Sequence, residues 1–454
     1  MHVVSSQAPR SPRLVDVLRR RGRRVRDRWL RVRRHPRSIW WAFAALHGAV
    51  LLALTPLMLA GGVSGDLPLY RTWASGALTD GTWPVLDFAW VYPAGALVPI
   101  VLADVLGGSH YQLVWLLLLT AANALSLWLL TDRGRRTVDA TAAWWWLLAL
   151  LLLSPVAFLR LEGFSAPLVV AGLVLLARHP RTAGVLLAVA TWIKVWPAAV
   201  IAAVGVAASR RTSVLWAGVG VTGVVAGVVV VAGGATHLDS FITMQADRRL
   251  QVEAPLATPW VWMAMLRVPG ASVYENVALA TREVMGPGDW WATNGSTTLM
   301  FAVLLTIVGL LAIARFGVPG GPRPVVDETD LVLRGALALT CTFVVLNKVG
   351  SPQYMLWIAP VVAVGLFLRP DEHRTPAVLT AWAAGLTTLV FPLLYRPLLD
   401  LHAVPVGVLG ARNLLVVLLF GWSVVRVVDA VLPALGLEGR TLAGLVGARR
   451  ASGR

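Results

Sequence analysis

The sequence predicts an all-α integral membrane protein, a polytopic helical bundle of about 12 transmembrane helices with large outer loops. Hydrophobic residues make up 57% of the 454 residues and charged residues only 14%, and the mean hydropathy is +0.70. Apolar runs of roughly 20 residues recur along the chain, which is the length that spans a bilayer as a helix. Apolar and polar residues do not alternate within these runs, which argues against a transmembrane β-barrel.

The basic charge is carried almost entirely by arginine. The net charge is +17, and 38 of the 40 basic residues are arginines. They cluster at short polar breaks, which is typical of cytoplasmic loops, so we expect no nucleic-acid partner. Residues 1–38 contain 13 arginines without a small-residue cleavage site, which predicts a basic cytoplasmic tail near anionic lipid rather than a signal peptide. The single cysteine, Cys341, excludes an intrachain disulfide and argues against a zinc or redox role.

The arginine-rich breaks set the expected topology, because such breaks favour the cytoplasmic side of a plasma membrane. They lie at 1–38, Arg133–Arg136, Arg178–Arg181, Arg210–Arg211, Arg315–Arg323, Arg369–Arg374 and from Arg426 onward. Spans are expected at 39–60, 110–131, 142–159, 163–177, 213–232, 296–314, 331–346, 352–368, 375–394 and 406–430. A transmembrane domain over 39–432 would then carry outer loops at 61–109 and 233–295, with interfacial helices. The tails 1–38 and 433–454, and so both termini, would be cytoplasmic.

Residues 182–209 are flanked by arginine on both sides and are too long for one ideal span but too short for two. We interpret them as two short helices that meet at Lys194-Val195-Trp196-Pro197, where the proline ends or kinks the first helix. The alternative is one long, tilted span. Discontinuous helices at membrane depth occur where they line protein or a cavity, and they often mark a binding site.

The only two lysines, Lys194 and Lys348, both lie in apolar stretches. A lysine at membrane depth needs a partner, an anion or water, and the alternative is that it snorkels to the headgroups. The expected topology places both on the outer face with most of the other unusual polar residues. That set is Asp66, Tyr70, Asp87, Tyr92, Arg160, Glu162, Lys194, Asp239, Asp247, Arg248, Glu253, Lys348, Gln353, Tyr354 and Arg396.

Acids and bases gathered at an outer membrane interface suggest chemistry on a lipid-linked phosphate. Cations hold a phosphate ester and stabilise it as a leaving group, and the candidates are Lys194, Lys348, Arg160 and Arg248. A sugar hydroxyl acceptor would need a general base. The chemistry alone does not choose among Asp66, Asp87, Glu162 and Glu253.

Several motifs occur in the order found in a known family. They are GDLPLY with Asp66, DFAWVYPAG with Tyr92, RLEG with Arg160 and Glu162, AGVLLAVATWIKVWP with Lys194, QADRRLQVE with Arg248 and Glu253, and NKVGSPQYMLW with Lys348, Gln353 and Tyr354. Over roughly residues 40–420 the chain resembles the GT-C membrane glycosyltransferases, specifically glycosyltransferase family 87 and related actinobacterial polyprenyl-phosphomannose-dependent mannosyltransferases. It departs from the usual YPP, which is YPA here, and it lacks the GQ–N turn of some members.

The resemblance implies an extracytoplasmic active site and an inverting transfer of a sugar, by analogy mannose, from a polyprenyl-phosphate donor to a lipid or glycan hydroxyl. In GT-C enzymes the first outer loop typically carries the catalytic Asp, which maps to Asp66. Lys194, Lys348, Arg248, Gln353, Tyr354, Arg160, Glu162, Tyr92, Asp87 and Glu253 are then expected substrate contacts. No cofactor or divalent metal is expected, because the chain has no strong DxD motif and no metal-ligand spacing of histidines.

Each candidate also has a structural alternative. Asp66 could cap a helix, and Asp87 could serve only in a turn. Arg160 could pair with Glu162 across the turn between two helices. In SPQY, Ser351 could be only a cap for the helix that Pro352 begins. Asp247, Arg248 and Glu253 could form a salt-bridged interfacial helix.

Two other functions would use similar residues. A transporter or flippase of an anionic lipid-linked substrate would hold the headgroup with the same cations and would also contain broken helices. The two long outer segments and the polar residues on one face argue against it, because alternating access needs a site near the midplane. A non-catalytic envelope scaffold would not need lysines at membrane depth.

Overall fold

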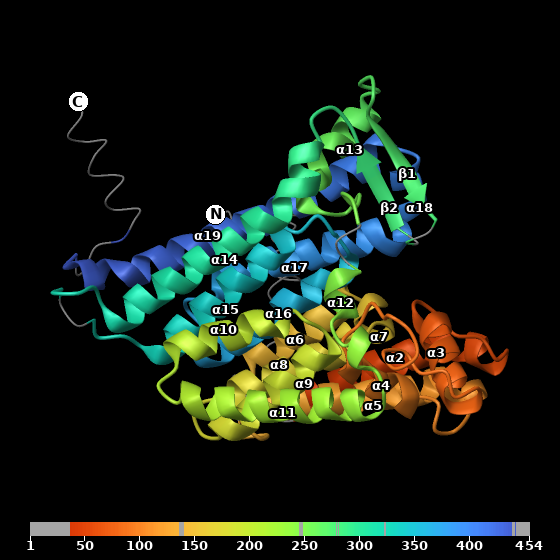
Figure 1. Cartoon of the computed structure of the whole chain (residues 1–454), viewed down its shortest axis with the longest axis horizontal. Helices are drawn as coiled ribbons and strands as arrows, with labels where there is room; N and C mark the ends of the chain where they lie inside the picture. The colour runs from red at the N-terminus through yellow and green to blue at the C-terminus, as the bar shows by residue number, and fades with distance from the viewer. Residues whose placement is uncertain are drawn as a thin grey trace, which may run out of the picture.

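The protein is a bundle of long helices that carries a smaller lobe at one end. The computed structural model describes residues 37–135, 140–244, 248–277, 279, 281–321, 324–437 and 441. The long helices run along one axis, and α3, α13, α18 and a β-hairpin gather at one end of it (right in Figure 1). We call this the loop end and the opposite end, which holds residues 176–180, 208–210 and 369–373, the arginine end. The protein is thus a largely helical membrane protein, as predicted.

Six helices are long and apolar enough to cross a membrane within the described residues. They are α2 (Ser38–Leu59), α5 with the preceding turn (Gly108–Leu130), α11 (Arg211–Val231), α14 (Trp290–Phe316), α17 with its irregular end (Arg374–Leu393), and α19 with its last turn (Ala403–Leu435). Helices α2 and α11 keep most of their apolar side chains outside the protein core, as lipid-facing spans do.

The remaining bundle helices are shorter. They are α6 (Thr141–Leu152), α8 (Glu162–Leu175), α9 (Pro180–Ile193), α10 (Pro197–Ala207), α15 (Glu328–Val345) and α16 (Met355–Leu368). The span expected at 142–159 is divided, because Pro155 separates α6 from the short α7 (Val156–Leu159). The total of about 12 spans therefore stays a prediction.

The break expected within 182–209 is confirmed. Helix α9 ends at Ile193, Lys194 adopts an extended backbone, and α10 begins with Pro197 at its first position. Proline suits this position because the first amide of a helix has no intrahelical partner. The segment therefore forms two helices, and the alternative of one long, tilted span is wrong.

Both segments that were expected to form outer loops contain short elements. Residues 61–109 hold α3 (Leu67–Thr79) and α4 (Leu97–Leu102), as expected for a loop with short helices. The second segment holds α12 (Ser240–Thr243), α13 (Thr258–Met265) and an antiparallel hairpin. Its strands are β1 (Ser272–Asn276) and β2 (Thr281–Met285), with Val273 opposite Val284. The sequence analysis did not predict this hairpin.

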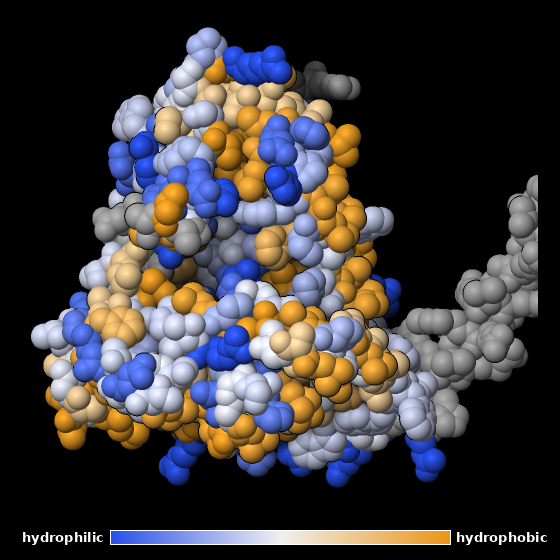
Figure 2. All heavy atoms as spheres, turned by 90° about the vertical axis from the view of Figure 1, so that its right-hand side faces the viewer, coloured by the Kyte–Doolittle hydropathy of each residue, from blue (hydrophilic) through white to orange (hydrophobic). Residues whose placement is uncertain are grey.

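The loop-end lobe has a core of its own. Leu250, Val252, Trp260, Val284 and Leu398 pack together there, apart from the large core of the bundle. The loop end is hollowed between this upper lobe and the lower elements, and hydrophilic side chains are visible inside the hollow (Figure 2).

A close backbone approach joins the lobe to the bundle. The Gln251 amide donates to the Lys348 carbonyl at 3.0 Å, and the Gly350 amide donates to Gln251 Oε1 at 3.2 Å. A Cβ atom on Gly350 would lie 2.1 Å from the Ala254 nitrogen, which no side chain tolerates. Glycine at 350 is therefore required for the two segments to touch.

We predict that Gly350→Ala destabilises the protein, since the added methyl group must push two backbones apart. The expected loss is about 1–3 kcal/mol, measured as a lower midpoint of thermal unfolding in detergent. Gly407→Ala is the matched control, because a Cβ there meets nothing within 4 Å and alanine favours the helix. Equal midpoints for the two variants would contradict the close approach.

Candidate functional site

Asp66 lies at the start of α3 and pairs with Arg160, which lies in the extended break between α7 and α8. The Tyr70 hydroxyl donates to Asp66 Oδ2 at 3.3 Å. The Asp66 side chain makes no capping hydrogen bond to α3, so the helix-cap alternative is wrong. Its carboxylate instead contacts the Arg160 guanidinium directly.

A second ion pair lies behind the first. Lys194 Nζ is 3.1 Å from Glu162 Oε1, and the Glu162 side chain is fully buried. The Lys194 ammonium also lies 4.4 Å from the centre of the Tyr92 ring, within the range of a cation–π contact. Lys194 therefore finds its partners inside the protein rather than by snorkelling. Arg160 and Glu162 pair with different residues, so the proposed pairing of these two with each other is wrong.

The two ion pairs form one electrostatic cluster. The carboxyl group of Asp66, just before α3, interacts with the charges of Arg160, Glu162 and Lys194. Burial raises the pKa of Asp66 above its usual value, and the Arg160 charge opposes this rise. Asp66 is thus a carboxylate of increased basicity that still has a cation beside it.

The 347–354 loop closes the other side of the site. Gln353 and Tyr354 are both buried, and the Tyr354 ring stacks on Trp357 with centroids 3.8 Å apart. Ser351 makes no capping hydrogen bond to the backbone, and its hydroxyl donates to Gln353 Oε1 instead. The role of Ser351 as a cap is therefore wrong.

Tyr354 connects the two halves of the site. Its side chain interacts electrostatically with Glu162 and Tyr92 of the bundle and with Arg248 and Glu253 of the lobe. Arg248 Nε is buried and has no hydrogen-bond partner among the described residues. Residues 248–254 are not helical, so the salt-bridged helix is wrong, and Asp247 lies outside the described residues.

The sequence analysis missed Arg412. This fully buried arginine of α19 lies 3.7 Å from Glu253 Oε2, which makes it the charge partner of that carboxylate. Burial raises the pKa of Glu253 to about 7, against the opposing charges of Arg412 and Arg160 and a hydrogen bond from Tyr395. An arginine amid the apolar run 406–430 was the available signal, because it needs a buried partner.

Asp87 and Lys348 were also expected to contact the substrate, and each has a structural contact within the protein. The Asp87 carboxylate accepts a hydrogen bond from the Trp83 amide at 2.7 Å, which is the turn role considered above. Lys348 lies on the 347–354 loop, where its carbonyl accepts from Gln251. Contacts of both residues with a substrate stay predictions, as does independence from a metal ion. No group of three or more His, Cys, Asp or Glu side chains could hold a metal within the described ranges.

A bundle of apolar helices with two adjoining, largely buried ion pairs defines a membrane protein with a polar site. Residues 90–316, half of the chain, match the family model of glycosyltransferase family 87. The chain therefore belongs to glycosyltransferase family 87, as its motifs predicted, and is a membrane glycosyltransferase. None of the curated proteins matches the chain.

The matched range contains much of the site but not all of it. Tyr92, Arg160, Glu162 and Lys194 lie inside it, together with the 248–254 segment. Asp66 and the 347–354 loop lie outside. These two parts are connected to the matched range by the contacts described above.

We predict that Glu253→Gln destabilises the protein at pH 8, because it leaves Arg412 buried without a counter-charge. The expected loss is about 3 kcal/mol or more, and it should shrink below pH 7, where Glu253 itself becomes neutral. Thermal unfolding across pH measures it.

The double variant Glu253→Gln/Arg412→Met is the control, since it removes both charges and should recover most of the lost stability. A single variant as stable as the wild type at pH 8 would show that the pair is not a buried ion pair.

Proposed function

We propose that the enzyme transfers a sugar from a polyprenyl-phosphate donor to a hydroxyl of a lipid or glycan acceptor, with Asp66 as the general base. The observation that carries the proposal is the cluster in which Asp66 faces Arg160 while Lys194 lies behind them on Glu162. The cluster combines a carboxylate of raised pKa with cations suited to a phosphate. These are the two functions that the transfer needs.

The reaction has one displacement step. The acceptor oxygen attacks the anomeric carbon, and its proton passes to the Asp66 carboxylate. The bond between the anomeric carbon and the phosphate oxygen breaks, and polyprenyl phosphate leaves with the electron pair. Attack from the face opposite to the leaving group inverts the configuration, so no covalent enzyme intermediate is needed.

Cations would stabilise the leaving phosphate. Lys194 is the strongest candidate, since Glu162 and the Tyr92 ring hold its ammonium in place. Arg248 has an unpaired, buried Nε among the described residues and lies in electrostatic range of Tyr354. Lys348 would add a third cation from the 347–354 loop, and the buried side chains of Gln353 and Tyr354 would line the sugar subsite.

The identity of the sugar and the side of the membrane that the active site faces are proposed from the sequence rather than from the charge cluster. Mannose follows from the resemblance to polyprenyl-phosphomannose-dependent enzymes. An active site that faces outside a plasma membrane, with both termini cytoplasmic, follows from the arginine-rich breaks at the arginine end. Family membership favours transfer over the transporter or flippase, although the broken helix suits either class.

We predict that Asp66→Asn lowers the rate of sugar transfer about 100-fold or more, because the amide cannot accept the acceptor proton. The assay uses purified protein, a radiolabelled polyprenyl-phosphate mannose and total envelope lipid. Asp80→Asn is the control, since Asp80 is an exposed carboxylate at the end of the same short helix. Full turnover by the Asp66 variant would overturn the assignment.

We predict that kcat/KM falls at acid pH, with an apparent pKa above the usual value near 3.9 for an aspartate, since only ionised Asp66 accepts a proton. Arg160→Gln should move this limb to higher pH, because the Arg160 charge lowers the pKa of Asp66. An acid limb that keeps its position in Arg160→Gln, or that moves to lower pH, would contradict the role of Asp66.

The Arg160 charge also lowers the pKa of Glu253. The effect of Arg160→Gln on the pH profile is therefore measured a second time, in protein that also carries Glu253→Gln. If Asp66 is the titrating base, the shift caused by Arg160→Gln persists in Glu253→Gln protein. If the shift disappears there, Glu253 is the group that titrates.

A further inference from the structure

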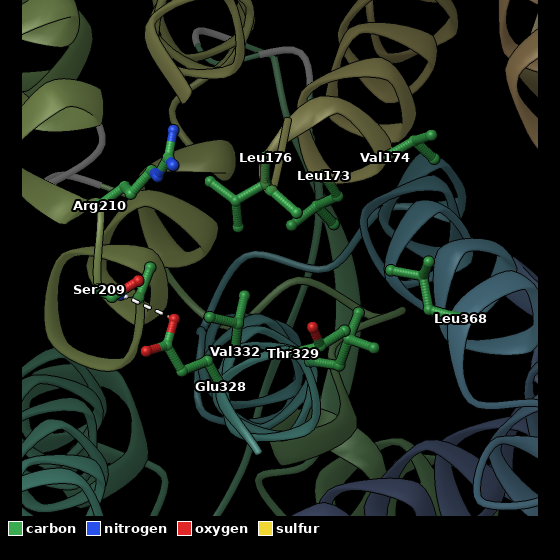
Figure 3. A pocket seen from close by; sticks show the side chains of 12 residues that line it. Leu173, Val174, Leu176, Ser209, Arg210, Glu328, Thr329, Val332 and Leu368 are labelled. Atoms are coloured by element: carbon green, nitrogen blue, oxygen red, sulfur yellow. Dashed lines mark hydrogen bonds between the residues drawn. The ribbon is translucent and has the colours of Figure 1, made fainter. Parts of the chain in front are cut away.

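A cavity lies at the arginine end, far from the Asp66 cluster. It opens between the ends of α8, α15 and α16 and the turn from α10 to α11, and Figure 3 shows its lining. Leu173 of α8, Leu176 just after α8, Val332 of α15 and Leu368 of α16 point into it (Figure 3). Its volume is about 200 Å³, far above the roughly 30 Å³ that a water molecule occupies in the liquid.

A shallow basic recess adjoins this cavity. His179, Arg181 and Ser213 line it, and Arg210 lines both the recess and the cavity. The recess lies where α9 begins at Pro180 and α11 begins at Arg211. Two helix N-termini therefore add their positive ends to the arginine charges.

The charges of the two arginines are not compensated by protein carboxylates. Among the residues that the structure describes, neither Arg181 nor Arg210 has an ion-pair partner. One acid, Glu328, lines the cavity, and its carboxylate accepts from the Ser209 amide at 3.0 Å (Figure 3). The same carboxylate pairs with Arg315 at 2.9 Å. Its negative charge is thus already balanced by another arginine, and the recess stays available to an anion.

We propose that the cavity and the basic recess together bind one anionic phospholipid. The phosphate would lie against Arg181 and Arg210, and part of an acyl chain would fill the cavity between Leu173, Leu176 and Val332. An apolar compartment joined to a basic one fits a molecule that has both parts, whereas free phosphate would leave the apolar compartment empty. This lipid is neither donor nor acceptor, because the site is at the opposite end of the bundle from Asp66.

The site would also join separate parts of the bundle. Helices α8, α15 and α16 line the cavity, and the recess is built on α9 and α11. A lipid bound to both would stabilise the folded state by the free energy of its own binding. The proposal is independent of the proposed transfer reaction, since it rests only on residues of the arginine end.

The test is a lipid titration of the purified full-length protein, followed by native mass spectrometry. Phosphatidylglycerol and phosphatidylcholine with the same acyl chains are compared, with inorganic phosphate as a competitor. We expect phosphatidylglycerol to bind more tightly, and phosphate at the same concentration not to displace it. Arg181→Gln and Arg210→Gln should each weaken phosphatidylglycerol binding about fivefold, the effect of one basic charge near a lipid surface.

Arg211→Gln is the matched control, because the Arg211 guanidinium lies over the Phe316 ring at 4.9 Å and does not line either compartment. Val332→Phe fills the cavity and should also weaken binding. The proposal is wrong if the two lipids bind equally, or if the Arg181/Arg210 double variant binds phosphatidylglycerol as tightly as the wild type. The bound lipid would then be unspecific surface lipid. Displacement of phosphatidylglycerol by inorganic phosphate would show that the recess binds an anion only and that the cavity holds no acyl chain. If a variant does not fold, the lipid comparison and the phosphate competition on wild-type protein still decide.

Discussion

The site depends on the ion pair between Lys194 and Glu162 inside the bundle. A charged side chain in a low-dielectric interior is costly unless a partner compensates it, and removal of either partner leaves the other buried and unpaired. Lys194 lies in the break between α9 and α10, and Glu162 is the first residue of α8. Tyr92 brings the segment 61–109 to the same ammonium, so the helix break, the pair and this segment constrain one another.

The second half of the site is built differently. The lobe has its own small core and joins the bundle through backbone contacts between 251–254 and 347–354. Gly350 allows this approach, and the buried Glu253–Arg412 pair fixes the lobe to α19. Tyr354 lies where both halves meet, in range of Glu162 on one side and Glu253 on the other. The bundle and the lobe therefore each contribute charged side chains to one site.

Local sequence signals predicted the bundle and the position of Lys194. Apolar run length indicated a helical membrane protein, and Pro197 indicated the break between α9 and α10. Partners distant in sequence were not predictable, because no spacing rule connects Asp66 with Arg160, or Glu253 with Arg412. The hairpin was missed because SVYEN and TREVM are short, polar strands that the topology assigned to a loop. Arg412 escaped attention because the arginine argument was applied to breaks and not to the middle of an apolar run.

The most direct test of the account is a structure of the enzyme with polyprenyl phosphate bound, determined by cryo-electron microscopy. The account predicts that the phosphate lies in the hollow of the loop end, within about 3 Å of Lys194 Nζ, with the Asp66 carboxylate facing the same space. Phosphate density elsewhere on the protein, with Lys194 still paired only to Glu162, would contradict the assignment of this cluster as the active site.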